Sequence, residues 1–367
     1  MKEQKSLGAL LSSVRPTDET AMQKAAARLD GLAKPPGSLG RLEEAAVALA
    51  GVYGEVHHPI KKKRLLVFAA DNGVTEEGIS SAPPSVTLAQ TVNLTRQKTG
   101  AAVLCAHFGD EIRVFDVGIA LPLPPEARAV TDCKISFGTA NIRKKDAMPR
   151  KDAERAILIG AQASAVAAAE GVDVLGIGEM GIGNTTTSAA VLCALTGLAP
   201  EEATGRGGGL SDGAFARKKE VIADALRRAK PDPADPVGVL SAVGGLDIAA
   251  MTGAFLGAAA CRIPAVADGF ISAVAALCAV RLCPAARGYI FPSHQSTEPG
   301  YARAAAALGL APFLSLGMRL GEGSGCPLAF EVLAAAEAVI GGMSTFAEAK
   351  IDDGYLSELR KNEGYFS

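Results

Sequence analysis

The sequence predicts an α/β protein in which helices cover both faces of a parallel sheet. Continuous apolar runs that suit buried strands alternate with Ala-rich segments of helical periodicity. The 367 residues exceed what one small core requires and suit one large domain with an accessory unit. The apolar residues are mostly Ala, Leu, Val and Ile, and together with 41 Gly they indicate helices packed closely against a sheet.

The first predicted elements are two helices, which the Pro pair of "LAKPPGSLGRLEE" separates at 18–31 and 39–52. Six strand candidates then alternate with further helices. The strands are predicted at 64–71, 111–118, 172–178, 263–269, 287–293 and 311–317. The further helices are predicted at 85–108, 153–170, 184–197, 213–229, 247–261, 270–282, 299–308 and 327–342.

Polar or Gly-rich residues follow nearly every strand candidate. Examples are Asp71-Asn72-Gly73, Asp268-Gly269 and Ser293-His294-Gln295-Ser296, and the last candidate leads into "GEGSG". Because parallel sheets bind ligands beyond the carboxyl ends of their strands, we expect these residues to converge on one cleft.

Charge and composition exclude several classes of site. A net charge of −2 offers no electrostatic basis for binding nucleic acid. The seven Cys contain no C-x-x-C pair and the four His form no ligand-spaced cluster, so we expect free thiols and no metal site. The N-terminal segment lacks the apolar core of a signal peptide, and the long uncharged stretch at 180–200 is interrupted by Asn and Thr. We therefore expect a cytoplasmic protein with no membrane partner.

The stretch "GIGEMGIGNTTTSAAV" contains G-x-G-x-x-G after an apolar run. A dinucleotide fingerprint would need an acid at the end of a second strand about 20 residues later, which is absent, and Glu179 inside the loop would repel a pyrophosphate. A single phosphate fits better. Gly181 permits close backbone approach, while Asn184 and Thr185 offer capping oxygens and N–H groups at a helix start. An ordinary turn before a capped helix remains the alternative.

A second glycine loop, Gly207 to Gly209, precedes a helix whose first turns carry Lys218 between two further cations. A Lys near a helix N-terminus is unfavourable to the helix dipole, so it can face an anion. The alternative is a solvated helix face. Two such loops in one chain strengthen the phosphate hypothesis.

A third loop, "MRLGEGSGCPLAF", places Glu322 between two glycines. Glycines on both sides let a substrate ring approach the carboxylate, which suits a general base. A solvent-exposed loop Glu is the alternative. The stretch "SHQSTEPG" lacks the nucleophile elbow of a hydrolase, so Ser296 is interpreted as a hydroxyl ligand.

Eight ordered segments carry a resemblance to a known family over about residues 29–346. They are "LAKPPGSLGRLEE", "ADNGVTEEGIS", "GEMGIGNTTTSAAV", "GRGGGLSDGAFARK", "VGGLDIAAMTGAFLGAA", "ADGFISAVAAL", "SHQSTEPGY" and "LGEGSG". Together they resemble the nicotinate-nucleotide–dimethylbenzimidazole phosphoribosyltransferases of cobamide synthesis. The resemblance implies a Rossmann-like parallel sheet in residues 61–343. It also implies a small helical domain from residues 1–60 with 344–367, and a homodimer.

The resemblance also implies the reaction and its residues. Nicotinate mononucleotide would donate its phosphoribosyl group to a benzimidazole-like base, with inversion at C1′ and without a metal or other cofactor. Glu322 would be the general base, and Glu179 the second carboxylate near the reacting centre. The remaining implied roles are phosphate binding by Gly181, Asn184, Thr185, Gly207, Gly208 and Lys218, ribose or nicotinate binding by Asp268, Gly269 and Ser296, and a base pocket bordered by Ser85 and Leu320.

This chain departs from the family pattern at three places. Gly208 stands where the family usually has Thr, and Asn72 stands where many members have His. The stretch "SSAPPSVTLAQ" differs from the commoner aromatic-containing one, which leaves the preferred base open. Some relatives act on phenols or adenine, and some work as pairs of unlike subunits. The alternative is therefore a subunit of a heteromer with a paralogue, acting on phenolic or other bases and weakly active alone.

Overall fold

The structure is a computed structural model that describes residues 6–356, and the chain forms two compact units. The large unit contains the described residues of Met1–Arg15 together with Lys62–Ala329. The small unit contains Pro16–Lys61 and the described residues of Phe330–Ser367. Relative to the boundaries expected from the sequence, this division places residues 6–15 in the large unit and residues 330–343 in the small one.

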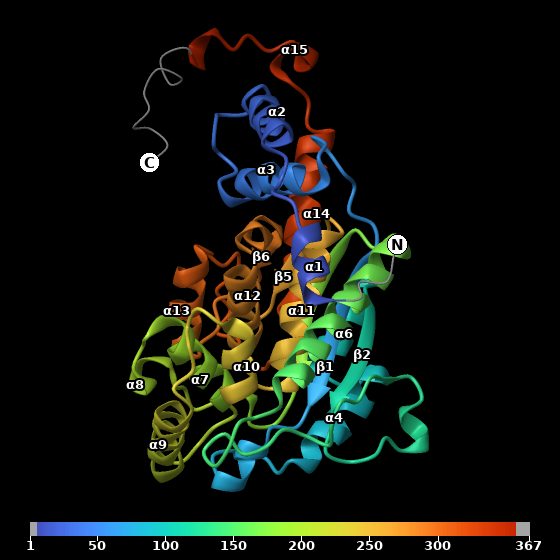
Figure 1. The fold of residues 1–367 in the computed structure, drawn as a ribbon. Coiled ribbons are helices and arrows are strands. Elements are labelled where there is room, and N and C mark those ends of the chain that lie inside the picture. Colours follow the sequence, from blue (N-terminus) through green and yellow to red (C-terminus); the bar gives the residue numbers. More distant parts are fainter. Residues whose placement is uncertain (1–5, 357–367) are drawn as a thin grey trace. The chain divides into compact units, whose positions relative to one another are not determined.

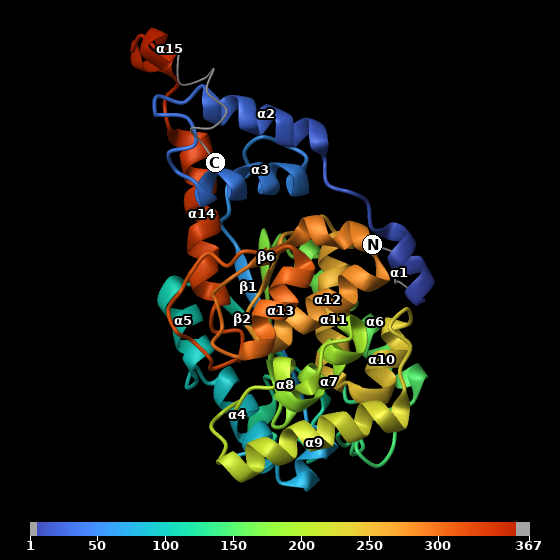
Figure 2. The same cartoon turned by 90° about the vertical axis from the view of Figure 1, so that its left-hand side faces the viewer.

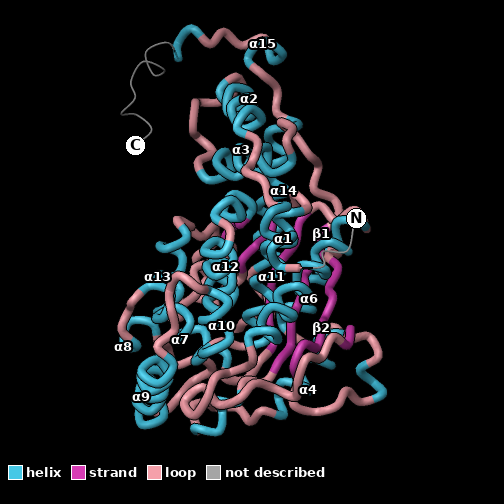
Figure 3. Tube along the Cα trace, in the orientation of Figure 1, coloured by secondary structure: helices cyan, strands magenta, loops and turns pink. Residues whose placement is uncertain are grey.

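A parallel six-stranded sheet runs through the middle of the large unit (Figures 1 and 3). Its strand order is β3-β2-β1-β4-β5-β6, and every neighbouring pair is parallel. The order reverses between β1 and β4, which is where open α/β sheets bind ligands. The strands are β1 (Lys63–Ala70), β2 (Glu111–Gly118), β3 (Thr131–Asp132), β4 (Val174–Met180), β5 (Ala265–Ala267) and β6 (Ile290–Pro292).

The predicted fold class is confirmed, although one of the six predicted strands is wrong. Residues 311–317 form a loop that makes a single parallel bridge, between Leu314 and His294. Pro312 in this segment has no N–H to donate, and Leu316 is 58% exposed, so the segment cannot continue a buried ladder. The sixth strand is instead β3, which is too short and too exposed to give a hydrophobic pattern.

Helices cover both faces of the sheet, and short 3₁₀ turns connect several of them. The α-helices of the large unit are α1 (Leu7–Ser13), α4 (Ser85–Thr95), α5 (Gly100–Phe108), α6 (Arg150–Ala169), α7 (Asn184–Thr196), α8 (Pro200–Ala203), α9 (Asp212–Ala229), α10 (Pro236–Val243), α11 (Leu246–Ala260), α12 (Phe270–Leu282) and α13 (Pro299–Leu308). The 3₁₀ turns of this unit are η1 (Gly73–Glu77), η2 (Pro125–Ala127) and η3 (Pro284–Tyr289). Helices α7, α8 and α9 lie side by side (Figure 2).

The single helix predicted at 85–108 is two helices, α4 and α5. The chain leaves the helical conformation at Gln97, whose φ is +57°, and Thr99 caps the new helix by accepting the N–H of Ala102. Both helices pack against β2. The break matters because it brings the N-terminus of α5 to the site described below.

Helices α6 and α11 pack unusually closely, which explains the abundance of Gly and Ala. A Cβ on Gly160 would lie 1.7 Å from the Ala250 carbonyl oxygen, and one on Gly253 would lie 1.7 Å from the Ile157 carbonyl oxygen. Only glycine permits this approach of the two backbones. Helix α11 also packs against β1, β2 and β4, so this contact positions one whole face of the sheet.

The small unit is formed by one segment near the start of the chain and one near its end. Helices α2 (Glu19–Asp30) and α3 (Arg41–Tyr53) pack together, and α14 (Cys326–Gly342) continues into this unit, followed by α15 (Phe346–Ala349) and the turn η4 (Gly354–Leu356). Glu337 accepts the backbone N–H of His58 at 2.9 Å, and Arg28 Nε donates to the Ile340 carbonyl oxygen at 2.6 Å. No helix among residues 6–356 is long and apolar enough to cross a membrane.

Candidate active site

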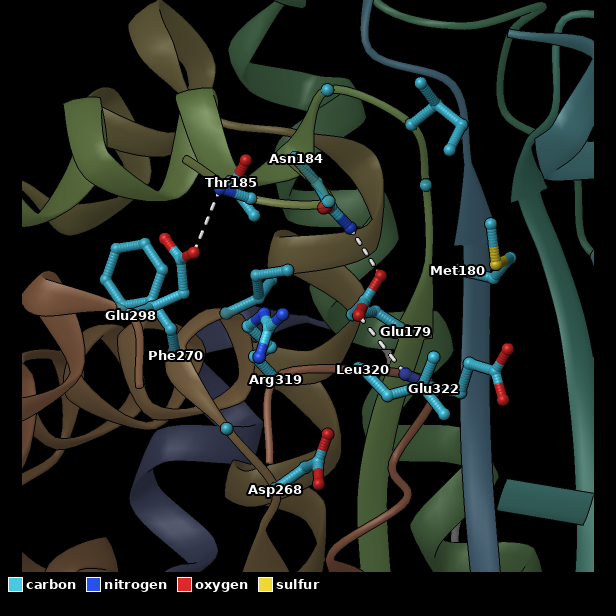
Figure 4. A pocket seen from close by; sticks show the side chains of 18 of the residues that line it. Glu179, Met180, Asn184, Thr185, Asp268, Phe270, Glu298, Arg319, Leu320 and Glu322 are labelled. Atoms are coloured by element: carbon cyan, nitrogen blue, oxygen red, sulfur yellow. Dashed lines mark hydrogen bonds between the residues drawn. The ribbon is translucent and has the colours of Figure 1, made fainter. Parts of the chain in front are cut away.

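A pocket of about 260 Å³ opens at the carboxyl ends of β4, β5 and β6, all within the large unit. Most residues predicted from the glycine loops line it, whereas Ser85 and Lys218 do not. The predicted residues that line it are Glu179, Gly181, Asn184, Thr185, Gly207, Gly208, Asp268, Gly269, Ser296, Leu320 and Glu322. Figure 4 shows several of these side chains facing a common space.

Glu322 stands in an unusual backbone conformation at the pocket wall. Its φ is +64°, and its neighbours Gly321 and Gly323 have φ values of +87° and +83°. A left-handed conformation is unfavourable for a residue with a Cβ, so the surrounding contacts must hold it. Glu322 Oε2 accepts the N–H of Ala101 at 3.2 Å in the first turn of α5. This hydrogen bond joins the loop of Glu322 to the N-terminus of α5.

Asp268, at the end of β5, holds the loop that carries Glu322. Its Oδ1 accepts the N–H of Gly325 at 2.7 Å and its Oδ2 accepts the N–H of Gly323 at 3.2 Å. The prediction that Asp268 binds ribose or nicotinate is untested, but both carboxylate oxygens already have backbone partners. Burial raises the pKa of Asp268 to about 7, while these two N–H groups act in the opposite direction.

Glu179, at the end of β4, also lines the pocket and contacts the loop of Glu322 as part of a buried acidic network. Its Oε1 accepts the backbone N–H of Glu322 at 3.4 Å, and its Oε2 accepts a hydrogen bond from the side-chain nitrogen of Asn184 (Figure 4). The same side-chain nitrogen donates to Asp247 at 3.0 Å. Burial, with smaller contributions from the Asp247 and Asp268 carboxyls, raises the pKa of Glu179 to about 8.

Asn184 therefore differs from the sequence-based expectation. Gly183, with φ of +94°, is the N-cap of α7, and Asn184 is the first helical residue. Its side-chain nitrogen donates to the carboxyls of Glu179 and Asp247, and it does not cap α7. The predicted role of Asn184 in phosphate binding stays untested. Thr185, one residue later, lines the pocket at the N-terminus of α7.

The glycines of the G-x-G-x-x-G pattern serve packing between protein segments. A Cβ on Gly178 would lie 2.7 Å from the Gly323 Cα, and a Cβ on Gly181 would lie 2.5 Å from the Ala70 carbonyl oxygen. Gly178 thus lets the loop of Glu322 cross the end of β4. The pattern marks a functional site, although for a reason that sequence spacing could not reveal.

The second glycine loop lies beside the N-terminus of α7. Lys218, on α9, is 1% exposed, and its Nζ donates to Thr185 Oγ1 at 2.8 Å and to the Gly205 carbonyl oxygen at 3.0 Å. Burial lowers the pKa of Lys218 to about 8. The Gly207 N–H donates to Glu298 at 2.9 Å. Lys218 therefore stands behind the pocket wall and acts on it through Thr185.

The structure adds pocket residues to which the sequence gave no role. Arg319 and Glu298 are charged, and His294, expected only as part of a strand end at the cleft, is buried beside Asp268, with burial lowering its pKa. No spacing rule identifies them, because they come from loops that the fold brings together. The exposed Ser85 begins α4 outside the lining, and Val86 and Gln90 of that helix face the pocket instead.

Within residues 6–356, no three or more His, Cys, Asp and Glu side chains are grouped so that they could hold a metal ion. The seven cysteines are all free, and four of them are buried.

Comparisons with known proteins agree with this arrangement. A family model described as "Phosphoribosyltransferase" matches residues 14–351. A nicotinate-nucleotide–dimethylbenzimidazole phosphoribosyltransferase of Clostridium perfringens is 47% identical over 98% of this chain and 99% of its own length. The enzyme of that name from Ruminiclostridium cellulolyticum is 48% identical over 93% of this chain and 97% of its own length.

Solved structures agree as well. The crystal structure of the Thermus thermophilus enzyme of the same name matches with a TM-score of 0.87 at 38% identity, covering 92% of this chain and all of that one. The fold, the position of the pocket and the sequence identity all support one family assignment. This chain belongs to the phosphoribosyltransferase family, in the group of nicotinate-nucleotide–dimethylbenzimidazole phosphoribosyltransferases that its sequence segments resemble.

Proposed function

We propose that this protein transfers the phosphoribosyl group of nicotinate mononucleotide to 5,6-dimethylbenzimidazole or an analogous base. The products would be α-ribazole 5′-phosphate and nicotinate. The observation that carries the proposal is the position of Glu322, held at the pocket wall in a left-handed conformation with its carboxylate at the N-terminus of α5. The names of the relatives supply the substrates.

The charges of the pocket suit this donor. Four acidic side chains line it (Glu179, Asp268, Glu298 and Glu322). A positively charged pyridinium ring or oxocarbenium-like ribose beside them would lower the raised pKa values of Glu179 and Asp268, and the carboxylates so formed would stabilise that charge. The 5′-phosphate would lie at the N-terminus of α7, near Thr185, because free N–H groups and the helix dipole favour an anion there. Lys218 supports that site through its bond to Thr185.

Glu322 would act as the general base. It removes the N–H proton of the incoming base, and the other ring nitrogen of that base attacks C1′ of the ribose. The C1′–N bond to nicotinate breaks on the opposite face, and the pyridinium nitrogen takes the bonding electron pair. Attack opposite the leaving group inverts the β configuration to α. The protonated Glu322 then releases its proton to solvent.

The test combines product analysis with one substitution. The full chain is incubated with nicotinate mononucleotide and 5,6-dimethylbenzimidazole, and mass spectrometry and NMR identify the riboside phosphate and its anomeric configuration. Glu322→Gln should bind the nucleotide and lose about 10²–10⁴-fold in kcat. A Glu322→Gln variant with a near-wild-type rate, or a β product, would contradict the mechanism. The homodimer and the cytoplasmic location stay predictions.

A further inference from the structure

Arg319 is the one Arg or Lys side chain among the residues that line the pocket in the described part of the chain. It belongs to the loop that carries Glu322 and lies three positions before it. Its guanidinium makes no hydrogen bond or ion pair with any residue of 6–356, although four acidic side chains share the pocket. Arg319 is exposed at the pocket, so its guanidinium is accessible to a bound ligand.

Each of the four acids already has a backbone partner. Glu322 accepts the N–H of Ala101, and Glu298 accepts that of Gly207. Glu179 and Asp268 likewise accept N–H groups from the loop of Glu322. These contacts hold the walls of the pocket, and none of the four acids pairs with Arg319, whose guanidinium can therefore receive an anionic group of a ligand.

The position of Arg319 in the pocket indicates which anionic group of the substrate it would bind. In the view of Figure 4 the Arg319 side chain is drawn between those of Phe270 and Glu179, and the Glu322 side chain is drawn beyond Glu179. In an inverting displacement the attacking base and the leaving group lie on opposite sides of C1′. With the attacking base beside Glu322, the side of the pocket that contains Arg319 receives the leaving group.

We propose that Arg319 binds the carboxylate of the nicotinate ring and thereby selects nicotinate mononucleotide over nicotinamide mononucleotide. This inference rests on the proposed function. A guanidinium can donate two parallel hydrogen bonds to a planar carboxylate. A neutral carboxamide has only one acceptor oxygen, and its NH₂ group is itself a donor. The 5′-phosphate is served elsewhere, by the N-terminus of α7 and Lys218 behind Thr185. The nicotinate anion released on breaking the C1′–N bond stays paired with Arg319 until it leaves.

The test compares two donors in two enzymes. Kinetic constants for nicotinate mononucleotide and nicotinamide mononucleotide are measured with wild type and Arg319→Gln. Loss of a charge-assisted pair should lower kcat/KM for the nicotinate donor about 10- to 100-fold, mostly through KM. The value for the nicotinamide donor should change less than about threefold, so the preference for nicotinate collapses. Arg319→Lys keeps the positive charge but cannot form the paired hydrogen bonds, so its kcat/KM for the nicotinate donor should lie between those of wild type and Arg319→Gln.

The matched control is Arg303→Gln, which removes an exposed arginine of α13 that pairs with Glu202 outside the pocket. It should leave both donors unchanged. Equal losses for both donors in Arg319→Gln would assign the residue to the phosphate or to the loop and overturn the proposal, as would no loss at all.

A binding measurement separates this proposal from the proposed function. Calorimetry of free nicotinate and free nicotinamide with each variant requires no transfer. If Arg319→Gln binds nicotinate more weakly than wild type but binds nicotinamide equally well, the carboxylate site is supported. That conclusion holds even if wild type forms no riboside, since the absence of riboside would refute only the transferase reaction. Unchanged binding of nicotinate would refute the carboxylate site even in a fully active enzyme.

Discussion

The backbone N–H of Glu322 donates to the side-chain carboxyl of Glu179 at 3.4 Å. The first residue is left-handed and the second is buried with a raised pKa, so each is unfavourable by itself. Their contact links the end of β4 to the loop before α14. The conformation of the proposed base thus depends on an acid that is distant in sequence.

The first prediction concerns the stability of the Glu179 site. Because its pKa is about 8 in the folded chain and 4.5 in the reference state, the folded chain holds more protons between these values. The stability that this group contributes is fully present below pH 4.5 and is lost as the pH rises through 8. Glu179→Gln should remove up to roughly 4 kcal/mol of this pH dependence, measured by urea unfolding at pH 5 and pH 8. Parallel curves for wild type and Glu179→Gln would contradict it, and the exposed Glu201→Gln is the control.

The second prediction concerns the clamp made by Asp268. Asparagine keeps one acceptor oxygen, so Asp268→Asn leaves either Gly323 or Gly325 without its partner, at a cost of about 1–3 kcal/mol. The loop then holds Glu322 less firmly, and kcat should fall by about tenfold or more while binding of the nucleotide changes little. Steady-state kinetics measures this change. The control is Asp212→Asn, which removes an exposed ion pair with Arg206 and should leave kcat unchanged.

The third prediction tests the interpretation of the glycine pattern. In Gly178→Ala the new methyl group meets the backbone of Gly323, which cannot move without moving Glu322. Activity should fall far more than the fraction of folded protein, because overpacking costs about 1–3 kcal/mol in stability. Activity per folded molecule, with folding followed by circular dichroism, is the measurement. An active Gly178→Ala enzyme would show that the crossing of these segments has no catalytic importance.

The fourth prediction concerns the contact between α6 and α11. Gly253→Ala places a methyl group against the Ile157 carbonyl, so the two helices must separate, and the free energy of unfolding should fall by about 1–3 kcal/mol or more. The activity of the folded fraction should persist, since neither Gly253 nor Ile157 lines the pocket. Gly213→Ala, in open space on α9, should instead gain about 0.5–1 kcal/mol. Thermal unfolding of the two variants gives the comparison.

The fifth prediction uses the lowered pKa of Lys218. A protonated Lys218 favours a phosphate at Thr185, so the affinity for nicotinate mononucleotide should decline as the pH rises above about 8. Lys218→Met should weaken binding at pH 7 and remove that decline. Lys219→Met, whose ammonium lies over the Phe215 ring, is the neighbouring control. Binding that falls with pH in the same way in Lys218→Met would assign the titration to another group.

Much of the architecture could be predicted because strands and helices carry their own local patterns. Buried apolar runs located β1, β2, β4, β5 and β6, and helical periodicity located α6, α7, α9, α11 and α12 within a few residues. The errors lie where local pattern and environment disagree. Residues 311–317 are apolar enough for a strand but lie exposed at the rim, and Thr131–Asp132 pair at the sheet edge with no apolar signal.

By itself, the sequence determined the fold class, the family and the loops that meet at the pocket, because glycine, proline and buried apolar runs act over short distances. Tertiary structure alone decided what each side chain does there. Asn184 was expected to cap a helix but bridges two acids. Asp268 lines the pocket as expected, and the structure adds that it holds the loop of Glu322. Arg319 was given no role by the sequence. The physical reason is that partners such as Asp247 for Asn184 and Gly325 for Asp268 lie more than fifty residues away along the chain, and no local pattern encodes such pairs.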